Sequence, residues 1–176
     1  MRGLADEARI RRFMRELGRA ARRPARVYLT GGATAVLSGW RASTIDIDLK
    51  LVPDDDALMR AIPALKESLQ VNVELAAPID FIPVMDGWEE RSRFIVQEGP
   101  LTFLDFDLAA QALSKIERGH AQDLEDVREM IRRGLVQPAS LRATFDAIES
   151  QLYRYPALDP GSFRRALDET LASVES

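Results

Sequence analysis

The stretch Val27–Leu51, with the sequence VYLTGGATAVLSGWRASTIDIDLKL, determines the fold that we expect for this chain. Val27–Leu29 is a short apolar run of β-forming residues, and it stops at the glycine pair Gly31-Gly32. Neither glycine has a Cβ atom, so the backbone of this turn can come close to a ligand. The small residues of Ala33–Leu37 predict a short helix, whose first N–H groups and positive dipole end would face an anion.

A second strand is predicted for TIDIDL at residues 44–49. Side chains alternate between the two faces of a strand, so Asp46 and Asp48 share one face. The opposite face is expected to carry Ile45, Ile47 and Leu49. Two carboxylates about 7 Å apart repel by about 2 kcal/mol at an effective dielectric near 20. A divalent cation between them would remove this cost, and Mg²⁺ or Mn²⁺ prefers such oxygen ligands.

The acidic pattern alone is also typical of the solvent-exposed face of an edge strand. Together with the glycine pair, however, it resembles the DNA polymerase β-like nucleotidyltransferase superfamily. The signature of that superfamily is a glycine-containing helical turn followed by a strand that alternates acidic and apolar residues. Gly31-Gly32, Thr34 and Asp46–Leu49 match this signature. The form YLTGGATAVL…STIDIDL looks especially like small bacterial nucleotidyltransferases of the AbiEii type, which are toxins of type IV toxin–antitoxin pairs.

The resemblance implies an α/β (α+β) fold with a mixed sheet flanked by helices, followed by a C-terminal helical part. We therefore divide the chain into a nucleotidyltransferase core with an N-terminal helix, residues 1–106, and a helical region packed on it, residues 107–176. The implied activity is metal-dependent transfer of a nucleoside monophosphate from an NTP to an acceptor hydroxyl on a tRNA end or a protein. A toxin role with a cognate antitoxin as partner is also implied. The alternative is a catalytically silent relative that binds a nucleotide or a protein.

The resemblance assigns metal binding and catalysis to Asp46 and Asp48, with a third carboxylate on a neighbouring strand. Glu74, in the predicted strand Val71–Leu75, is the candidate for that position, where it would bind a second metal ion or assist proton removal. Asp80 is the rival, although prolines on both sides of it indicate a turn or a sheet edge. In the predicted strand, Asn72 and Glu74 share one face, and the other face carries Val71, Val73 and Leu75.

The nucleotide is expected to contact the glycine turn, two residues before the acidic strand and a later helical pair. In the AbiEii-type enzymes a lysine followed by an aspartate on that helical pair contributes to the nucleotide site. Lys115 and Asp123 match this order, although Lys115, like Glu117 and Arg118, also fits an ordinary charged helix surface. The full set of nucleotide-binding candidates is Thr30, Gly31, Gly32, Ala33, Thr34, Arg41, Thr44, Lys115 and Asp123.

The remaining elements follow from apolar periodicity and turn residues. An amphipathic helix is expected at residues 5–21 and another at 57–69, which Asp54–Asp56 would cap and Pro63 would kink or split. Residues 93–97 and 101–106 predict a hairpin joined by a Glu-Gly-Pro turn. Helical stripes are expected within residues 108–116, 124–135, 141–152 and 163–174.

Composition limits the classes of function. The 176 residues are 46% apolar, which is enough for a core, and they contain no cysteine, which excludes disulfides and thiol chemistry. The net charge of −4 argues against general nucleic-acid binding. Residues 1–26 nevertheless hold nine arginines and three acidic residues, which fits either a phosphate-binding surface or a solvated helix face. We see no long apolar run and no signal peptide, so we expect a cytoplasmic protein without a membrane partner.

Overall fold

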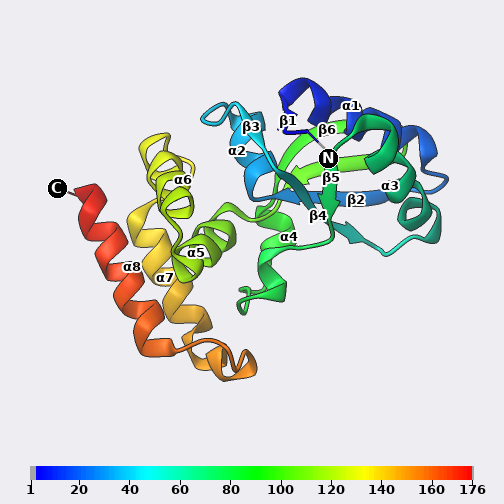
Figure 1. Ribbon diagram of the computed structural model, residues 1–176. Helices are drawn as coiled ribbons and strands as arrows, with labels where there is room; N and C mark the ends of the chain where they lie inside the picture. The colour runs from blue at the N-terminus through cyan, green and yellow to red at the C-terminus, as the bar shows by residue number, and fades with distance from the viewer. Residues whose placement is uncertain (1–2, 176) are drawn as a thin grey trace. The chain divides into compact units, whose positions relative to one another are not determined.

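The computed structural model describes residues 3–175, which form two compact units (Figure 1). The first unit holds the described residues up to Ala77 together with Ser92–Phe106. The second unit holds Pro78–Arg91 and the described residues from Asp107 onward. A mixed sheet, flanking helices and a C-terminal helical part are all present, which confirms the predicted α/β fold class.

The first unit is built on a five-stranded mixed sheet with the order β5-β4-β2-β7-β6. The strands are β2 (Ala25–Thr30), β4 (Asp46–Val52), β5 (Asn72–Glu74), β6 (Arg93–Glu98) and β7 (Leu101–Asp105). The central strand β2 pairs antiparallel with β4 and parallel with β7. The outer pairs are β4–β5, which is parallel, and β6–β7, which forms the predicted antiparallel hairpin. Strands β2 and β4, which the Val27–Leu51 stretch forms, therefore lie inside the sheet, with another strand on each side.

Helices α1 (Glu7–Ala20) and α3 (Asp56–Leu69) cover one face of this sheet (Figure 1). Each is capped by an aspartate, since Asp6 accepts a bond from the N–H of Arg9 and Asp55 accepts one from the N–H of Leu58. Helix α3 is continuous through Pro63, so the proline does not split it. The apolar stripes of both helices and of the strands form one core, which includes Ile10, Phe13, Leu17, Leu58, Ile62, Val27, Leu29, Ile47, Leu49 and Phe103.

Two residues predicted to lie on the apolar faces of strands are exposed. A separate two-stranded ribbon pairs β1 (Ala5–Asp6) with β3 (Ser43–Thr44), and the chain bends between β3 and β4. The prediction for Ile45 was wrong because this bend interrupts the strand alternation, and the residue is 70% exposed. Leu75 is also exposed, since it follows the last residue of β5.

The second unit is a helical bundle. Its main helices are α5 (Leu108–Arg118), α6 (Ala121–Arg132), α7 (Pro138–Ile148) and α8 (Pro160–Glu175). Short helical turns are η1 (Pro78–Asp80), α4 (Trp88–Arg91) and η2 (Glu149–Arg154). Helices α7 and α8 meet through Phe145 and Phe163, whose rings lie edge to face with centroids 4.9 Å apart. Gly119 ends α5 in the left-handed conformation, so the break between α5 and α6 falls where the sequence predicted it.

Residues 78–91 are joined to this bundle by hydrogen bonds to residues that lie later in the chain. Arg91 donates to the Asp107 carboxylate at 3.1 Å and to the carbonyl groups of Met85 and Asp86. The hydroxyl of Tyr155 donates to the carbonyl oxygen of Ile79 at 2.6 Å. These bonds tie the segment to the start of α5 and to the chain that follows η2.

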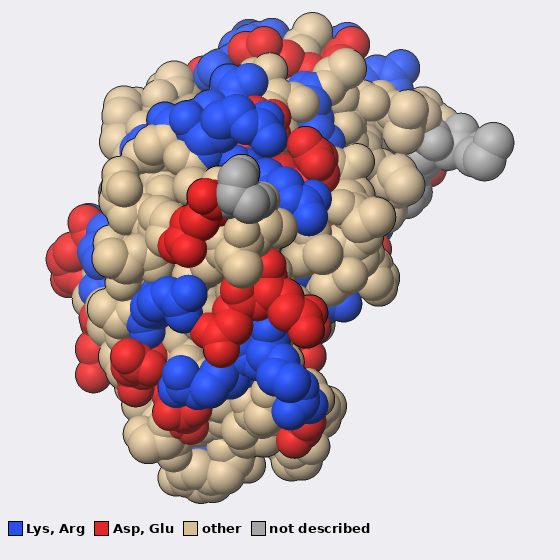
Figure 2. Space-filling view, turned by 90° about the vertical axis from the view of Figure 1, so that its left-hand side faces the viewer, with Lys and Arg blue, Asp and Glu red and all other residues tan. Residues whose placement is uncertain are grey.

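Acidic and basic side chains lie next to one another over the face shown in Figure 2. In the second unit, for example, Arg164 pairs with Glu149 at 2.9 Å and Arg142 pairs with Asp168 at 2.7 Å. Exposed pairs of this kind contribute little to stability. Among residues 3–175, no helix combines the length and the apolar character that crossing a bilayer requires.

Gly18 is expected to be essential for the packing of α1 on the hairpin. A Cβ atom at this position would lie 2.5 Å from the carbonyl oxygen of Glu98, which is backbone and cannot swing away. We expect Gly18→Ala to lower the free energy of unfolding by about 1–3 kcal/mol in urea denaturation, although alanine favours helix.

The matched control is Gly161→Ala in α8, where the nearest atom to an added Cβ is the end of the Arg165 side chain at 3.5 Å. This variant should be neutral or more stable by up to about 1 kcal/mol. Equal stabilities for the two variants would contradict the packing argument.

Candidate functional site

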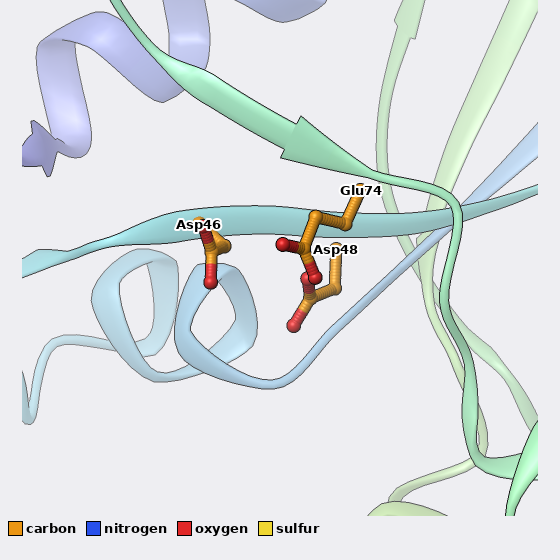
Figure 3. Close-up of side chains that lie close together, drawn as sticks. All are labelled: Asp46, Asp48 and Glu74. Atoms are coloured by element: carbon orange, nitrogen blue, oxygen red, sulfur yellow. The ribbon is translucent and has the colours of Figure 1, made fainter. Parts of the chain in front are cut away.

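Three carboxylates from two neighbouring strands converge in the first unit (Figure 3). Asp46 and Asp48 lie on β4, and Glu74 lies on β5. The parallel register places Glu74 beside Asp48 and Asn72 beside Asp46. Because paired residues on adjacent strands point to the same face, all three carboxylates leave the sheet on one side. One oxygen atom of each lies within 4.8 Å of the other two.

This cluster lies on the sheet face opposite the apolar core. Ile47 and Leu49 of the same strand are fully buried, while Asp46 and Asp48 are half-buried and Glu74 is exposed. Three negative charges this close repel by about 3 kcal/mol per pair at an effective dielectric near 20, and less where water reaches Glu74. The cluster therefore has a reason to attract a cation.

The donor set fits a hard divalent ion. Carboxylate oxygens are preferred by Mg²⁺, which binds its ligands at about 2.0–2.1 Å, so two ligands of one ion are at most about 4 Å apart. The observed separations are close to this limit, and a small side-chain rotation would meet it. The side-chain amide of Asn72 donates to the Asp46 carboxylate and helps to hold it in place.

The glycine turn lies directly against this cluster. Gly31 has φ 64°, a left-handed conformation that favours glycine, and it separates β2 from α2 (Gly32–Ser38). A Cβ atom at Gly31 would lie 3.0 Å from Oδ2 of Asp48. The ribbon that leads into α2 passes beside the labelled carboxylates in Figure 3. Thr30, the last residue of β2, is paired with Asp48 in the sheet.

Three further candidates meet at the second glycine. A Cβ atom at Gly32 would lie 1.9 Å from Oγ1 of Thr44 and 3.2 Å from Nη1 of Arg41. The Thr44 hydroxyl donates to the backbone carbonyl of Asp46 at 3.0 Å. The absence of a side chain at Gly32 therefore makes room for Thr44, which anchors the start of β4.

Ala33 and Thr34 direct their side chains into the protein. Ala33 is part of the apolar core, and Thr34 is only 1% exposed. The Thr34 hydroxyl donates to Oδ1 of Asp105 at 2.9 Å. Direct contact of these two residues with a nucleotide would therefore have to use their backbone.

Residues 8–158 match the family described as "nucleotidyltransferase of unknown function (DUF6036)". The chain belongs to this family. Its membership agrees with the class of protein that Val27–Leu51 predicted. Comparisons with curated proteins and with solved structures gave no match.

In this DUF6036 nucleotidyltransferase, the second unit holds Lys115 and Asp123 in a network of its own. Lys115 is 6% exposed, and its ammonium group donates to Asp126 at 2.7 Å and lies 3.9 Å from Asp123. Asp123 also accepts two bonds from Arg118 and one from the N–H of His120. Burial works to raise the pKa of Asp123, but the bonds and charge of Arg118 outweigh it, and the pKa is lowered. Asp80, the rival third carboxylate, lies in η1 of this unit and is not a member of the cluster.

Sequence reasoning did not single out Asp105 and Arg93 of the nucleotidyltransferase. These residues face each other across the hairpin, and Arg93 donates to Oδ2 of Asp105 through Nη2 at 2.8 Å and Nε at 3.1 Å. Asp105 is only 2% exposed. The available signal was the alternation of Leu101, Phe103 and Asp105, which puts a charged residue on the core-facing side of a strand.

Removal of the Lys115 charge tests how much the second unit depends on its buried ion pair. We expect Lys115→Met to lower the free energy of unfolding by about 3–5 kcal/mol, because the fully buried Asp126 would lose its charged partner. Asp126→Asn added to this variant should recover part of the loss. Lys66→Met, at a half-buried position on α3, should stay within about 0.5 kcal/mol of the wild type in the same urea titration. A Lys115→Met protein as stable as Lys66→Met would contradict this.

The buried Asp105 carboxyl should leave a signature in the pH dependence of stability. Burial raises its pKa above the ordinary value of 3.8, and the bonds from Arg93 and Thr34 with the charge of Arg93 offset only part of the shift. The folded state therefore binds this proton more tightly than the unfolded state, so the contribution of Asp105 to stability falls as pH rises from about 3.8.

Unfolding free energies measured between about pH 3 and 7 check this expectation. The wild type should lose stability relative to Asp105→Asn as pH rises through that range. Asp54→Asn, which changes an exposed aspartate outside the network, is measured in parallel as the control for removing one carboxylate. A wild-type advantage over Asp105→Asn that grows with pH would show that the shift has the opposite sign.

Proposed function

We propose that this protein transfers a nucleoside monophosphate from an NTP to an acceptor hydroxyl with the help of Mg²⁺ or Mn²⁺. The observation that carries the proposal is the convergence of Asp46, Asp48 and Glu74 beside the glycine turn at Gly31. Membership of a nucleotidyltransferase family supports the same reaction class.

The reaction exchanges a phosphoanhydride bond for a phosphoester bond at the α-phosphorus. The acceptor oxygen forms a bond to the α-phosphorus, while the bond from that phosphorus to the oxygen bridging it to the β-phosphorus breaks. Pyrophosphate leaves with that oxygen, and the acceptor proton passes to a carboxylate or to water. When bound, the divalent ion neutralises charge on the phosphates and on the attacking and leaving oxygens.

The three carboxylates divide the work between them in this proposal. Asp46 and Asp48 hold the ion, because both project from the same strand and their backbone is fixed by the sheet. Glu74 either binds a second ion or accepts the acceptor proton, and its exposure leaves it accessible to an incoming acceptor. Asn72 keeps the Asp46 carboxylate oriented toward the others.

The glycine turn is proposed as the place where the phosphates lie. A side chain at Gly31 would fill the space beside Asp48, so glycine keeps this space open. Backbone N–H groups of the turn and the guanidinium of Arg41 are the proposed phosphate contacts. Thr30, Gly32, Ala33, Thr34 and Thr44 shape the turn, while Lys115 and Asp123 stay as predicted contacts from the second unit.

The acceptor and the biological setting are proposed from the resemblance of Val27–Leu51 to AbiEii-type enzymes. That resemblance points to a tRNA end or a protein as acceptor. It also points to a toxin that is neutralised by a cognate antitoxin.

Label transfer tests the proposal directly. The protein is incubated with each α-labelled NTP, Mg²⁺ and either total tRNA or cell lysate. We expect transfer that is abolished by a chelator, restored by Mn²⁺, and reduced at least 100-fold by Asp46→Asn or Asp48→Asn. Asp54→Asn, which changes an exposed aspartate outside the cluster, is the matched control and should keep full activity. Growth of cells that express the same variants tests whether toxicity requires the transfer.

Tight NTP binding without transfer to either acceptor would instead support the catalytically silent alternative. Transfer that persists in both Asp46→Asn and Asp48→Asn would disprove the proposed site.

A further inference from the structure

We propose that Thr34, Asp105 and Arg93 form a positioning network that holds α2, and with it the glycine turn, in place beside Asp48. The network would act on nucleotide binding through the turn, without touching the nucleotide. This inference rests on the proposed function, because it assigns the turn to the nucleotide site.

The network joins α2 to the hairpin through one buried carboxylate. Oδ1 of Asp105 accepts the Thr34 hydroxyl at 2.9 Å, and Oδ2 accepts two bonds from Arg93. Both oxygen atoms of the carboxylate are therefore used, one by the helix and one by the neighbouring strand. Two donors of Arg93 converge on Oδ2, which leaves Oδ1 to the Thr34 hydroxyl.

The Asp105–Arg93 ion pair holds both turns of α2. Thr34 lies in the first turn and bonds to Asp105, while Ser38, the last residue of α2, accepts a bond from Nη2 of Arg93 at 3.1 Å. A seven-residue helix is too short to be stable by itself, so its position depends on such outside contacts. Gly31, the N-cap residue directly before the same helix, lies against Asp48. A shift of α2 would therefore change the space beside the metal-binding carboxylates.

The network also lies beside the end of β2, the strand that leads into the glycine turn. Asp105 is paired with Leu29 across β7 and β2, one residue before Thr30 and two before Gly31. The N–H of Phe106 donates to the carbonyl oxygen of Leu29 at 2.8 Å. The end of β2, the turn and α2 are thus fixed to β7 on the side away from Asp48.

Asp105 is 2% exposed, so burying its charge costs desolvation free energy, and apolar packing between the helix and the sheet is often as stable. What the ion pair supplies is a single defined geometry. Arg93 reaches solvent, with 43% of its side chain exposed, so its charge is only partly desolvated. The Thr34 hydroxyl has a single proton, and both of its acceptors are within the protein: Oδ1 of Asp105 at 2.9 Å and the carbonyl oxygen of Leu29 at 3.5 Å. Its effect on a phosphate would therefore be indirect.

The experiment compares Thr34→Val, Asp105→Asn and the double variant in the label-transfer assay, with KM and kcat for the NTP measured separately. We expect each single variant to raise KM about tenfold with a smaller change in kcat. The KM of the double variant should not exceed that of the single variant with the higher KM. Thr34→Ser keeps the hydroxyl and should rescue KM to within about threefold. Mn²⁺ affinity without nucleotide should not change, because the carboxylates of β4 and β5 remain in place.

The matched control is Thr102→Val on β7. Its hydroxyl bonds to Gln97 on the neighbouring strand and has no part in holding α2, so KM should stay at the wild-type value. Circular dichroism and urea denaturation establish that each variant is folded at the assay temperature. Thr34→Val is close to isosteric and keeps the test decisive if Asp105→Asn does not fold.

Several results would overturn the inference. A loss in Thr34→Val without a loss in Asp105→Asn would assign Thr34 to direct nucleotide contact. Losses that multiply in the double variant would mean that the two residues act independently. If Thr34→Val and Asp105→Asn lower the stability of the protein but leave KM unchanged, the network has a structural role only.

Failure of the proposed function gives a different pattern, in which the wild type neither binds nor transfers any NTP. Hydrogen exchange in the ligand-free protein then still reports on the network. The amide of Ala35 donates to the carbonyl oxygen of Gly31 at the start of α2, and the amide of Gly39 donates to that of Ala35 at its end. Both amides should exchange faster in Asp105→Asn than in the wild type. Unchanged exchange would show that the network does not hold the helix.

Discussion

The antiparallel register between β2 and β4 is the constraint on which the site depends. Leu29 is paired with Leu49 and Thr30 with Asp48, so the end of β2 is level with the acidic part of β4. A slip of one residue would exchange the two faces of β4, putting aspartates into the core and Ile47 into water. The burial of Ile47 and Leu49 under α1 and α3 therefore determines where the two carboxylates point.

Much of this arrangement could be predicted because its signals are local in sequence. Period-two alternation gave the faces of β4, and the glycine pair marked the turn before α2. Glu74 could be chosen over Asp80 because it lies on a strand pattern without flanking prolines, and it does lie beside Asp48. Whether any of these residues binds metal or nucleotide stays a prediction.

The parts that sequence reasoning missed depend on contacts between distant residues. Thr34 and Asp105 are brought together only by the parallel pairing of β2 with β7, which no short motif encodes. In the same way, residues 78–91 join the second unit through Arg91 and Tyr155, whose partners lie far along the chain or are backbone carbonyl groups. Ile45 was misplaced because a bend between two strands resets the alternation, and residue types alone do not reveal such a bend.

The three acidic positions differ in how tightly they are bound to the architecture. Asp46 and Asp48 alternate with core residues on a strand that has neighbours on both sides, whereas Glu74 ends a three-residue strand at the border of the sheet. An edge position is supported on one side only and tolerates change more easily. The location of the third acid therefore depends on a short border strand, whereas the locations of the first two are fixed by the core-facing residues that alternate with them on β4.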